Sequence, residues 1–235
     1  MCSHYEAPSP HQVAEAFGVA QFDQVRLDLW PGYIGPFLRR PDGLAGDNDS
    51  PPTKEVLTGS FGLIPSWSKD SKFAKRTYNA RSETVAEKPS FRHAWRHAQH
   101  CIIPAVAIYE PDWRSGKAIS TRIARADGEL LGIAGLWEQW RDPSTDQILH
   151  SYTMLTVNAD DHEGLPQTPG RKAHGSDFAE GFVYGLVDRA VGAERSVHEP
   201  VPGRSAGRGH VISLPWSWCG GQGDLSRWTA AATKP

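Results

Sequence analysis

The chain has 235 residues, of which 39% are hydrophobic and 22% are charged, a composition typical of a soluble globular protein. Its formal net charge is -2, so any contact with nucleic acid depends on a local basic surface and not on the overall charge. The three cysteines are scattered and no apolar run approaches the roughly 18 residues of a membrane span, so we expect a cytoplasmic protein with no disulfide framework and no membrane partner.

The chain begins with Met1 and Cys2. If Met1 is removed, Cys2 carries a free amine and a thiol on adjacent carbons, and this pair can condense with an aldehyde to give a five-membered thiazolidine. An N-terminal amine has a reference pKa of about 7.7–8.0, so part of it is unprotonated at neutral pH. A lone cysteine can equally be a small buried hydrophobic residue, and the dipeptide alone leaves both interpretations open.

The first predicted element is a helix. Residues 9–12 read SPHQ, a capping box with proline at the first helical position, and predict a helix that runs through Phe17. Residues 30–54 are rich in Pro, Gly and Asp and are expected to form a loop. Residues 55–64 have the composition of a strand, and residues 82–97 are expected to be partly helical.

Strands then dominate the next part of the chain. Residues 101–110 predict one strand, and residues 118–126 and 130–140 predict a hairpin joined across Asp127-Gly128. Residues 151–159 alternate between apolar and polar side chains as a further strand. The fold class we expect is α+β, a curled, barrel-like antiparallel sheet with a few short helices.

The chain changes character after residue 162. Residues 163–235 hold about half of the 23 glycines and few large aliphatic residues, and show no sustained period apart from a brief FVYGLV. We therefore expect one domain over residues 1–162, followed by a disordered glycine-rich tail without a further strand. The C-terminal part of the fold is accordingly expected not to be native-like.

An ordered set of motifs identifies a family. Met1-Cys2 is followed by GLIPSWSKD (62–70), YNARSET (78–84), CIIPAVAIYE (101–110) and GLWEQW (135–140). Together, in this order, they resemble the SOS-response-associated peptidase (SRAP) family, whose members crosslink to abasic sites in single-stranded DNA. The resemblance covers roughly residues 1–162.

The resemblance implies a catalytic set. Cys2, freed of Met1, would attack the aldehyde of the ring-opened abasic sugar and close a thiazolidine. Glu110 matches the family's catalytic glutamate, which shuttles protons during Schiff-base formation. Asn79 would orient the cysteine or the sugar. From the residues alone, Glu110 can also be a strand-end carboxylate and Asn79 a turn residue.

A basic stretch fits DNA. Between residues 69 and 97 basic side chains outnumber acidic ones and aromatic residues are interleaved, a pattern suited to phosphates and stacked bases; Phe91 and Trp95, four apart, are expected to be buried in the core. By the resemblance, Ser66 and Trp67 lie on the loop that the family wedges into DNA, and Arg81 contacts DNA. The remaining nucleic-acid-binding candidate is His4, which stands where the family commonly has arginine.

The tail departs from the family after residue 158. The family continues to a catalytic histidine and a strand, whereas neither His162 nor His174 has the expected context. Codons compatible with residues 170–179, read one base later, encode AERRMVVIL, which matches the expected strand. We therefore interpret residues 163–235 as an aberrant, frame-shifted tail. Loss of that strand is expected to destabilise the sheet and weaken the chain's activity.

The function expected from these features is covalent capture of abasic sites in single-stranded DNA, an enzyme-like, peptidase- or lyase-type activity of the SOS response. Three alternatives stay open: a thiol peptidase with autoproteolytic activity, a non-covalent single-stranded-DNA-binding module, and an inactive frame-shifted relic. We expect no cofactor and no metal, because paired cysteine spacing, HExxH and a glycine-rich phosphate loop are missing. We expect a monomer that associates with the nucleoid when it is on DNA.

Overall fold

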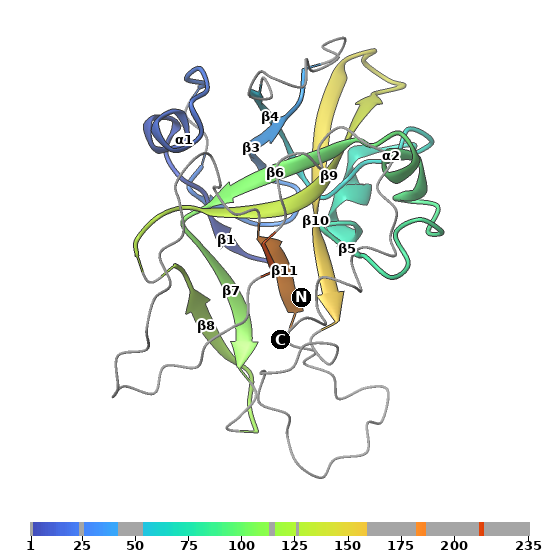
Figure 1. Ribbon diagram of the computed structural model, residues 1–235. Helices are drawn as coiled ribbons and strands as arrows, with labels where there is room; N and C mark the ends of the chain where they lie inside the picture. Colours follow the sequence, from blue (N-terminus) through green and yellow to red (C-terminus); the bar gives the residue numbers. More distant parts are fainter. Residues whose placement is uncertain are drawn as a thin grey trace, which may run out of the picture.

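The computed structural model describes residues 2–23, 26–41, 54–112, 116–125, 127–158, 182–186 and 212–213. A closed ring of strands forms its centre, because β10 pairs with both β4 and β9 while β9, β6, β3 and β4 pair in series (Figure 1). The strands of this barrel are β3 (Ile34–Arg39), β4 (Glu55–Phe61), β6 (His100–Ala105), β9 (Leu131–Arg141) and β10 (Ile148–Asn158). The barrel-like α+β fold expected from the sequence is confirmed.

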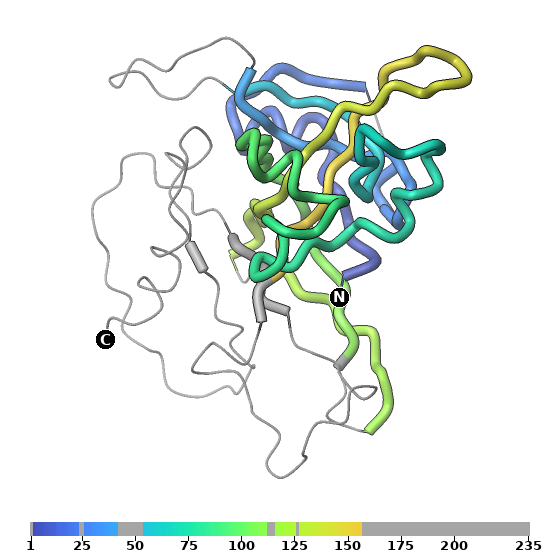
Figure 2. Tube along the Cα trace, turned by 90° about the vertical axis from the view of Figure 1, so that its right-hand side faces the viewer, coloured from blue at the N-terminus to red at the C-terminus, as the bar shows by residue number. Residues whose placement is uncertain are grey.

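A second, smaller sheet has the strand order β2-β1-β7-β8. Figures 1 and 2 show its β7–β8 hairpin extending away from the barrel. The strands of this sheet are β1 (Tyr5–Glu6), β2 (Asp28–Leu29), β7 (Ala107–Asp112) and β8 (Ile119–Ile123). The remaining elements are α1 (Pro10–Phe17), η1 (Ser71–Arg76), β5 (Asn79–Arg81), α2 (Arg92–Arg96), β11 (Phe182–Leu186) and β12 (Ile212–Ser213). None of the helices in the described ranges is long and apolar enough to cross a bilayer.

The barrel interior is filled by side chains that alternate along its strands. In β6, Cys101 and Ile103 belong to the central cluster, whereas Ile102 packs with Val13 of α1 in a separate cluster. The N-terminal segment contributes to the central cluster through Tyr5, whose hydroxyl lies 2.6 Å from that of Tyr152. Burial is the main reason why the pKa of Tyr5 is raised well above 10.0.

Helix α1 begins and ends where the sequence predicts. The Ser9 side chain accepts from the backbone of Gln12, the Gln12 side chain accepts from the backbone of Ser9, and Gly18 closes the helix in the left-handed conformation at φ 64°. At α2, the N-cap residue Phe91 is buried and Trp95 is partly buried in the cluster that contains Leu136 of β9, as the four-residue spacing predicts.

The prediction of a loop over residues 30–54 is wrong for Ile34–Arg39, which form the barrel strand β3. The Pro and Gly residues that suggested a loop have another role here. A Cβ atom at Gly35 would lie 2.4 Å from the Tyr152 hydroxyl, so the glycine lets the strand approach the core. Residues 42–53 lie outside the described part of the chain.

Two strand predictions need correction. Residues 101–110 form two strands in different sheets, because the chain breaks at Val106, whose N–H donates to the carbonyl of Glu6 across 2.8 Å. The strands on either side of Asp127-Gly128 do not form the predicted hairpin within the described residues. Instead β8 pairs with β7, and β9 pairs with β6 and β10. A two-residue turn signal is local, whereas strand partners depend on the whole sheet.

The last barrel strand joins distant parts of the chain. β10 confirms the strand predicted at residues 151–159, but it runs parallel to β4 and β5 and antiparallel to β9. The expectation that no strand follows is wrong for Phe182–Leu186, which pair antiparallel with β10 and β9. His162, His174, Cys219 and most of the predicted frame-shifted tail lie outside the described residues.

Candidate functional site

The N-terminal strand fixes the position of Cys2. β1 pairs antiparallel with β7, with Tyr5 opposite Ile108, and the Tyr109 N–H donates to the His4 carbonyl across 3.0 Å. The Cys2 side chain is fully buried in the central cluster, and its Sγ donates to the His4 carbonyl at 3.0 Å. Its sulfur is therefore held by the segment that leads into this small sheet.

Glu110 lies one residue beyond the hydrogen bond that joins Tyr109 to His4. Because side chains alternate along a strand, Glu110 is on the same face of β7 as Ile108. Ile108 packs in the cluster that contains Cys2, and Glu110 itself is half-buried. The register thus brings the β7 segment that carries Glu110 beside the segment that leads to Cys2.

Asn79 contacts the backbone of Cys2 from a different sheet. It begins β5, which is held parallel to β10 with Met154 opposite Asn79. The Asn79 Nδ2 donates to the carbonyl oxygen of Cys2 across 2.9 Å. Arg81, two residues on, is exposed on the same face of β5 as Asn79. The structure therefore joins Asn79 directly to Cys2, whereas the catalytic role of Glu110 and the DNA contact of Arg81 stay predictions.

His4 is held inside a column of aromatic rings. Its ring stacks on Tyr109 with centroids 4.2 Å apart and on Trp30 with centroids 4.3 Å apart. Its Nε2 pairs with the Asp28 carboxylate, and this contact is the main reason why the pKa of Asp28 lies below 3.8. The predicted role of His4 as a nucleic-acid contact stays a prediction.

A second carboxylate supports this column. Glu6 accepts from the Tyr109 hydroxyl and, at 2.7 and 2.9 Å, from the guanidinium of Arg122. The hydrogen bonds from Arg122, followed by that from Tyr109, lower the pKa of Glu6 to about 2. Sequence reasoning missed Trp30, Asp28 and Tyr109, because nothing in their local pattern shows that they meet around residue 4.

The predicted DNA-contacting loop lies apart from this network. Ser66 is exposed, and Trp67 is 55% exposed, with its ring edge-on to Phe73 and its Nε1 donating to the Pro89 carbonyl at 3.3 Å. The basic residues of the predicted surface are exposed without exception: Lys69, Lys72, Lys75, Arg76, Arg81, Lys88, Arg92 and Arg96. The whole segment is therefore open to a polyanion.

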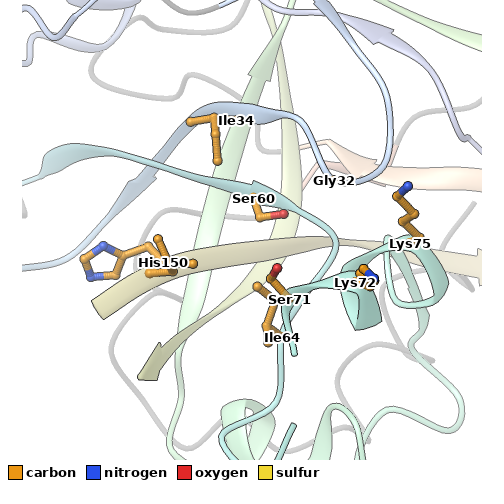
Figure 3. Close-up of a pocket in the computed structure, with 9 residues that line it drawn as sticks. Gly32, Ile34, Ser60, Ile64, Ser71, Lys72, Lys75 and His150 are labelled. Atoms are coloured by element: carbon orange, nitrogen blue, oxygen red, sulfur yellow. The ribbon is translucent and has the colours of Figure 1, made fainter. Parts of the chain in front are cut away.

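A cavity of about 210 Å³ lies beside this basic segment (Figure 3). Gly32, Lys72 and Lys75 are among its lining residues, whereas Cys2, Asn79 and Glu110 are not. Within the described ranges, no group of three or more His, Cys, Asp or Glu side chains is arranged to hold a metal ion.

Comparison of the sequence with known proteins finds a family model and several similar proteins. A sequence model described as SOS response associated peptidase (SRAP) matches residues 1–165. The abasic site processing protein YoqW of Bacillus subtilis (strain 168) is 38% identical over 112 residues, which are 45% of this chain and 49% of that protein. The abasic site processing protein HMCES of Gallus gallus is 29% identical over 150 residues, or 55% of this chain and 44% of that protein. The chain thus spans about half the length of these curated relatives.

A solved structure is similar over more of the chain. The crystal structure of a Bordetella bronchiseptica protein is 42% identical and superposes with a TM-score of 0.62, covering 80% of this chain and 84% of that one. A Bacteroides thetaiotaomicron protein, at 20% identity and a TM-score of 0.60, shares the fold.

Proposed function

Because the chain belongs to the SOS response associated peptidase (SRAP) family, we propose that it processes abasic sites in single-stranded DNA by covalent capture through Cys2. Relatives named as abasic site processing proteins support the class of substrate. The exposed basic segment from Lys69 to Arg96 supports a DNA partner, because its side chains can neutralise phosphates along a strand.

The chemistry begins with removal of Met1, which frees the amine of Cys2. This amine adds to the aldehyde carbon of the ring-opened sugar, and the carbinolamine loses water to give a Schiff base. The thiol sulfur then adds to the C=N carbon, its proton moves to nitrogen, and a thiazolidine forms. The sum is one aldehyde and one aminothiol giving one thiazolidine and one water, with no oxidant or reductant.

Glu110 is the proposed proton shuttle. A carboxylic acid can protonate the departing hydroxyl, and the resulting carboxylate can then accept the thiol proton. The observation that carries the proposal is the convergence of β1, β5 and β7 around Cys2: Asn79 donates to its carbonyl oxygen, and β7 brings Glu110 beside the same segment. This hydrogen bond fixes Cys2 by its backbone carbonyl.

The test is incubation with a single-stranded oligonucleotide that carries one abasic site, followed by denaturing electrophoresis. Wild type should form a band of protein attached to DNA, and Cys2→Ala should form none. Cys101→Ala is the matched control, because Cys101 is also a buried cysteine of the central cluster. An extra glutamate inserted between Met1 and Cys2, which keeps the amine blocked, should also abolish the band.

The same variants separate the alternatives. A non-covalent DNA-binding module would retain DNA binding in Cys2→Ala and show no covalent band in wild type. A thiol peptidase would turn over peptides and lose that turnover in Cys2→Ala. Equal covalent bands from wild type and Cys2→Ala would contradict the proposed capture.

A further inference from the structure

The stack of rings around His4 ends in a partly exposed ring. Tyr109, His4 and Trp30 are nearly parallel, with interplanar angles of 12° and 8°, and Trp30 at one end is 43% exposed. The Asp28 carboxylate accepts from both His4 Nε2 and Trp30 Nε1, the latter at 3.2 Å. The column is therefore rigid before any ligand arrives, and an additional flat ring can extend it at Trp30.

A tight turn joins this open end to two lysines. The Tyr33 N–H donates to the Trp30 carbonyl at 2.9 Å, and Gly32 within the turn has φ +92°. Lys75 lies against that glycine, because a methyl group added at Gly32 would be 3.7 Å from Lys75 Cε. Lys72 and Lys75 are both exposed and line the cavity of about 210 Å³ that Gly32 borders (Figure 3).

The surrounding charges leave this end of the molecule suited to an anion. Asp28 is engaged by His4 and Trp30, and Glu6 is engaged by Arg122 and Tyr109. On the other side of the turn, the Arg26 guanidinium lies over the Tyr33 ring, 5.0 Å from its centroid. Aromatic rings of the turn and positive charges beside it thus lie close together, which is the combination that holds single-stranded nucleic acid.

We propose that the turn from Trp30 to Tyr33 is a nucleotide subsite for the DNA strand that flanks the lesion. One base stacks on the open face of Trp30 and extends the ring column, while a phosphate of the same stretch lies against Lys75 and Lys72. The inference rests on the proposed function for the identity of the strand. The subsite accepts any base, because every base has a flat π face.

The test measures non-covalent binding of a fluorescein-labelled, undamaged oligothymidylate by anisotropy. Trp30→Leu should raise the Kd by roughly 5- to 150-fold, the loss expected for one stacked base, whereas Trp30→Phe keeps a ring and should stay near wild type. Lys75→Gln should weaken binding and reduce the magnitude of the slope of log K against log salt by about 0.7, the value for one phosphate on a single strand.

A second oligonucleotide isolates the stacking. A strand of the same length built from tetrahydrofuran spacers has the phosphates but no bases. On this strand Trp30→Leu should bind like wild type, whereas Lys75→Gln should still be weaker. An equal effect of Trp30→Leu on both strands, or no effect on either, would overturn the subsite.

The outcome for the subsite is separable from that for covalent capture. If the oligothymidylate responds as described and abasic DNA forms no covalent band, the subsite stands and the proposed function fails. If the covalent band forms but Trp30→Leu and Lys75→Gln bind undamaged DNA like wild type, the proposed function stands and the subsite fails. Failure of wild type to bind the oligothymidylate overturns the subsite as well.

Discussion

The side-chain nitrogen of Asn79 donates to the carbonyl oxygen of Cys2 across 2.9 Å, although the two residues are 77 positions apart in the chain. The contact depends on two sheets, because Asn79 is held by β10 of the barrel and Cys2 by the β1–β7 pairing. No described residue donates to the buried Oδ1 of Asn79, so only its nitrogen has a protein partner in that part of the chain.

Asn79→Ala should slow formation of the covalent adduct. The N-terminal residue loses the hydrogen bond that fixes its backbone, and misplacement of a reacting group costs on the order of a hundredfold in rate. Time courses at saturating abasic DNA would measure this. Asn79→Asp keeps the shape but not the donor and should be similarly slow; an Asn79→Asp rate equal to that of wild type would contradict the positioning role.

Gly62→Ala should destabilise the protein by at least roughly 3 kcal/mol. Gly62 has φ +112°, and a Cβ there would lie 1.9 Å from the Ala74 carbonyl oxygen, so backbone must move. Gly18→Ala is the matched control: its φ is +64° with nothing within 4 Å, and it should cost only roughly 1–2 kcal/mol. Urea unfolding of both variants measures the difference, and equal losses would show that the close approach at Gly62 is unimportant.

His93→Ala should destabilise the protein by about 2 kcal/mol, because it leaves an oxygen of a buried carboxylate without its hydrogen-bond partner. The Glu138 side chain is 4% exposed and its Oε2 lies 2.8 Å from His93 Nδ1. Adding Glu138→Gln to His93→Ala should recover part of the loss, since an amide is less costly to bury than a charge. His97→Ala is the control, because the His97 ring nitrogen bonds only a backbone carbonyl in the described hydrogen bonds. Thermal unfolding of the three variants provides the comparison.

His100 should make stability depend on pH. Burial lowers its pKa from 6.5 to about 4, so the folded protein binds fewer protons than the unfolded chain between these values. The stability that depends on the neutral ring is fully present above pH 6.5 and is lost as the pH falls through 4, on the order of 3 kcal/mol in all. The free energy of unfolding of wild type and His100→Phe, measured from pH 7.5 to 4.5, should differ in slope; parallel curves would contradict this assignment.

Elements that depend on their own residues were predictable. The capping residues on either side of α1 satisfy the first and last backbone groups of the helix locally, and they define it from Ser9 to Gly18. Alternation identified the strand β10, although its residues 151–156 are buried on both faces, and the spacing of Phe91 and Trp95 identified the side on which α2 and its N-cap are buried. The order of motifs likewise singled out Cys2, Asn79 and Glu110.

Elements that depend on distant partners were missed. The glycine and prolines around Ile34–Arg39 resemble a loop, and only the nearby Tyr152 hydroxyl explains why Gly35 belongs in a strand. The chain does turn at Asp127-Gly128, but β8 pairs with β7 and not with the strand that follows the turn. His4 was predicted as a DNA contact from its position, whereas its stacking between Tyr109 and Trp30 depends on strand register.

The sequence by itself determined the barrel-type fold, the caps of its first helix and the choice of candidate site residues, because these follow from local patterns and motif order. The tertiary structure alone decided that Asn79 meets the backbone of Cys2, that β10 closes the barrel beside a parallel partner, and that a ring column ends in an exposed Trp30. Strand pairing is chosen by the fit of whole faces across the sheet, and no local stretch of sequence encodes that fit.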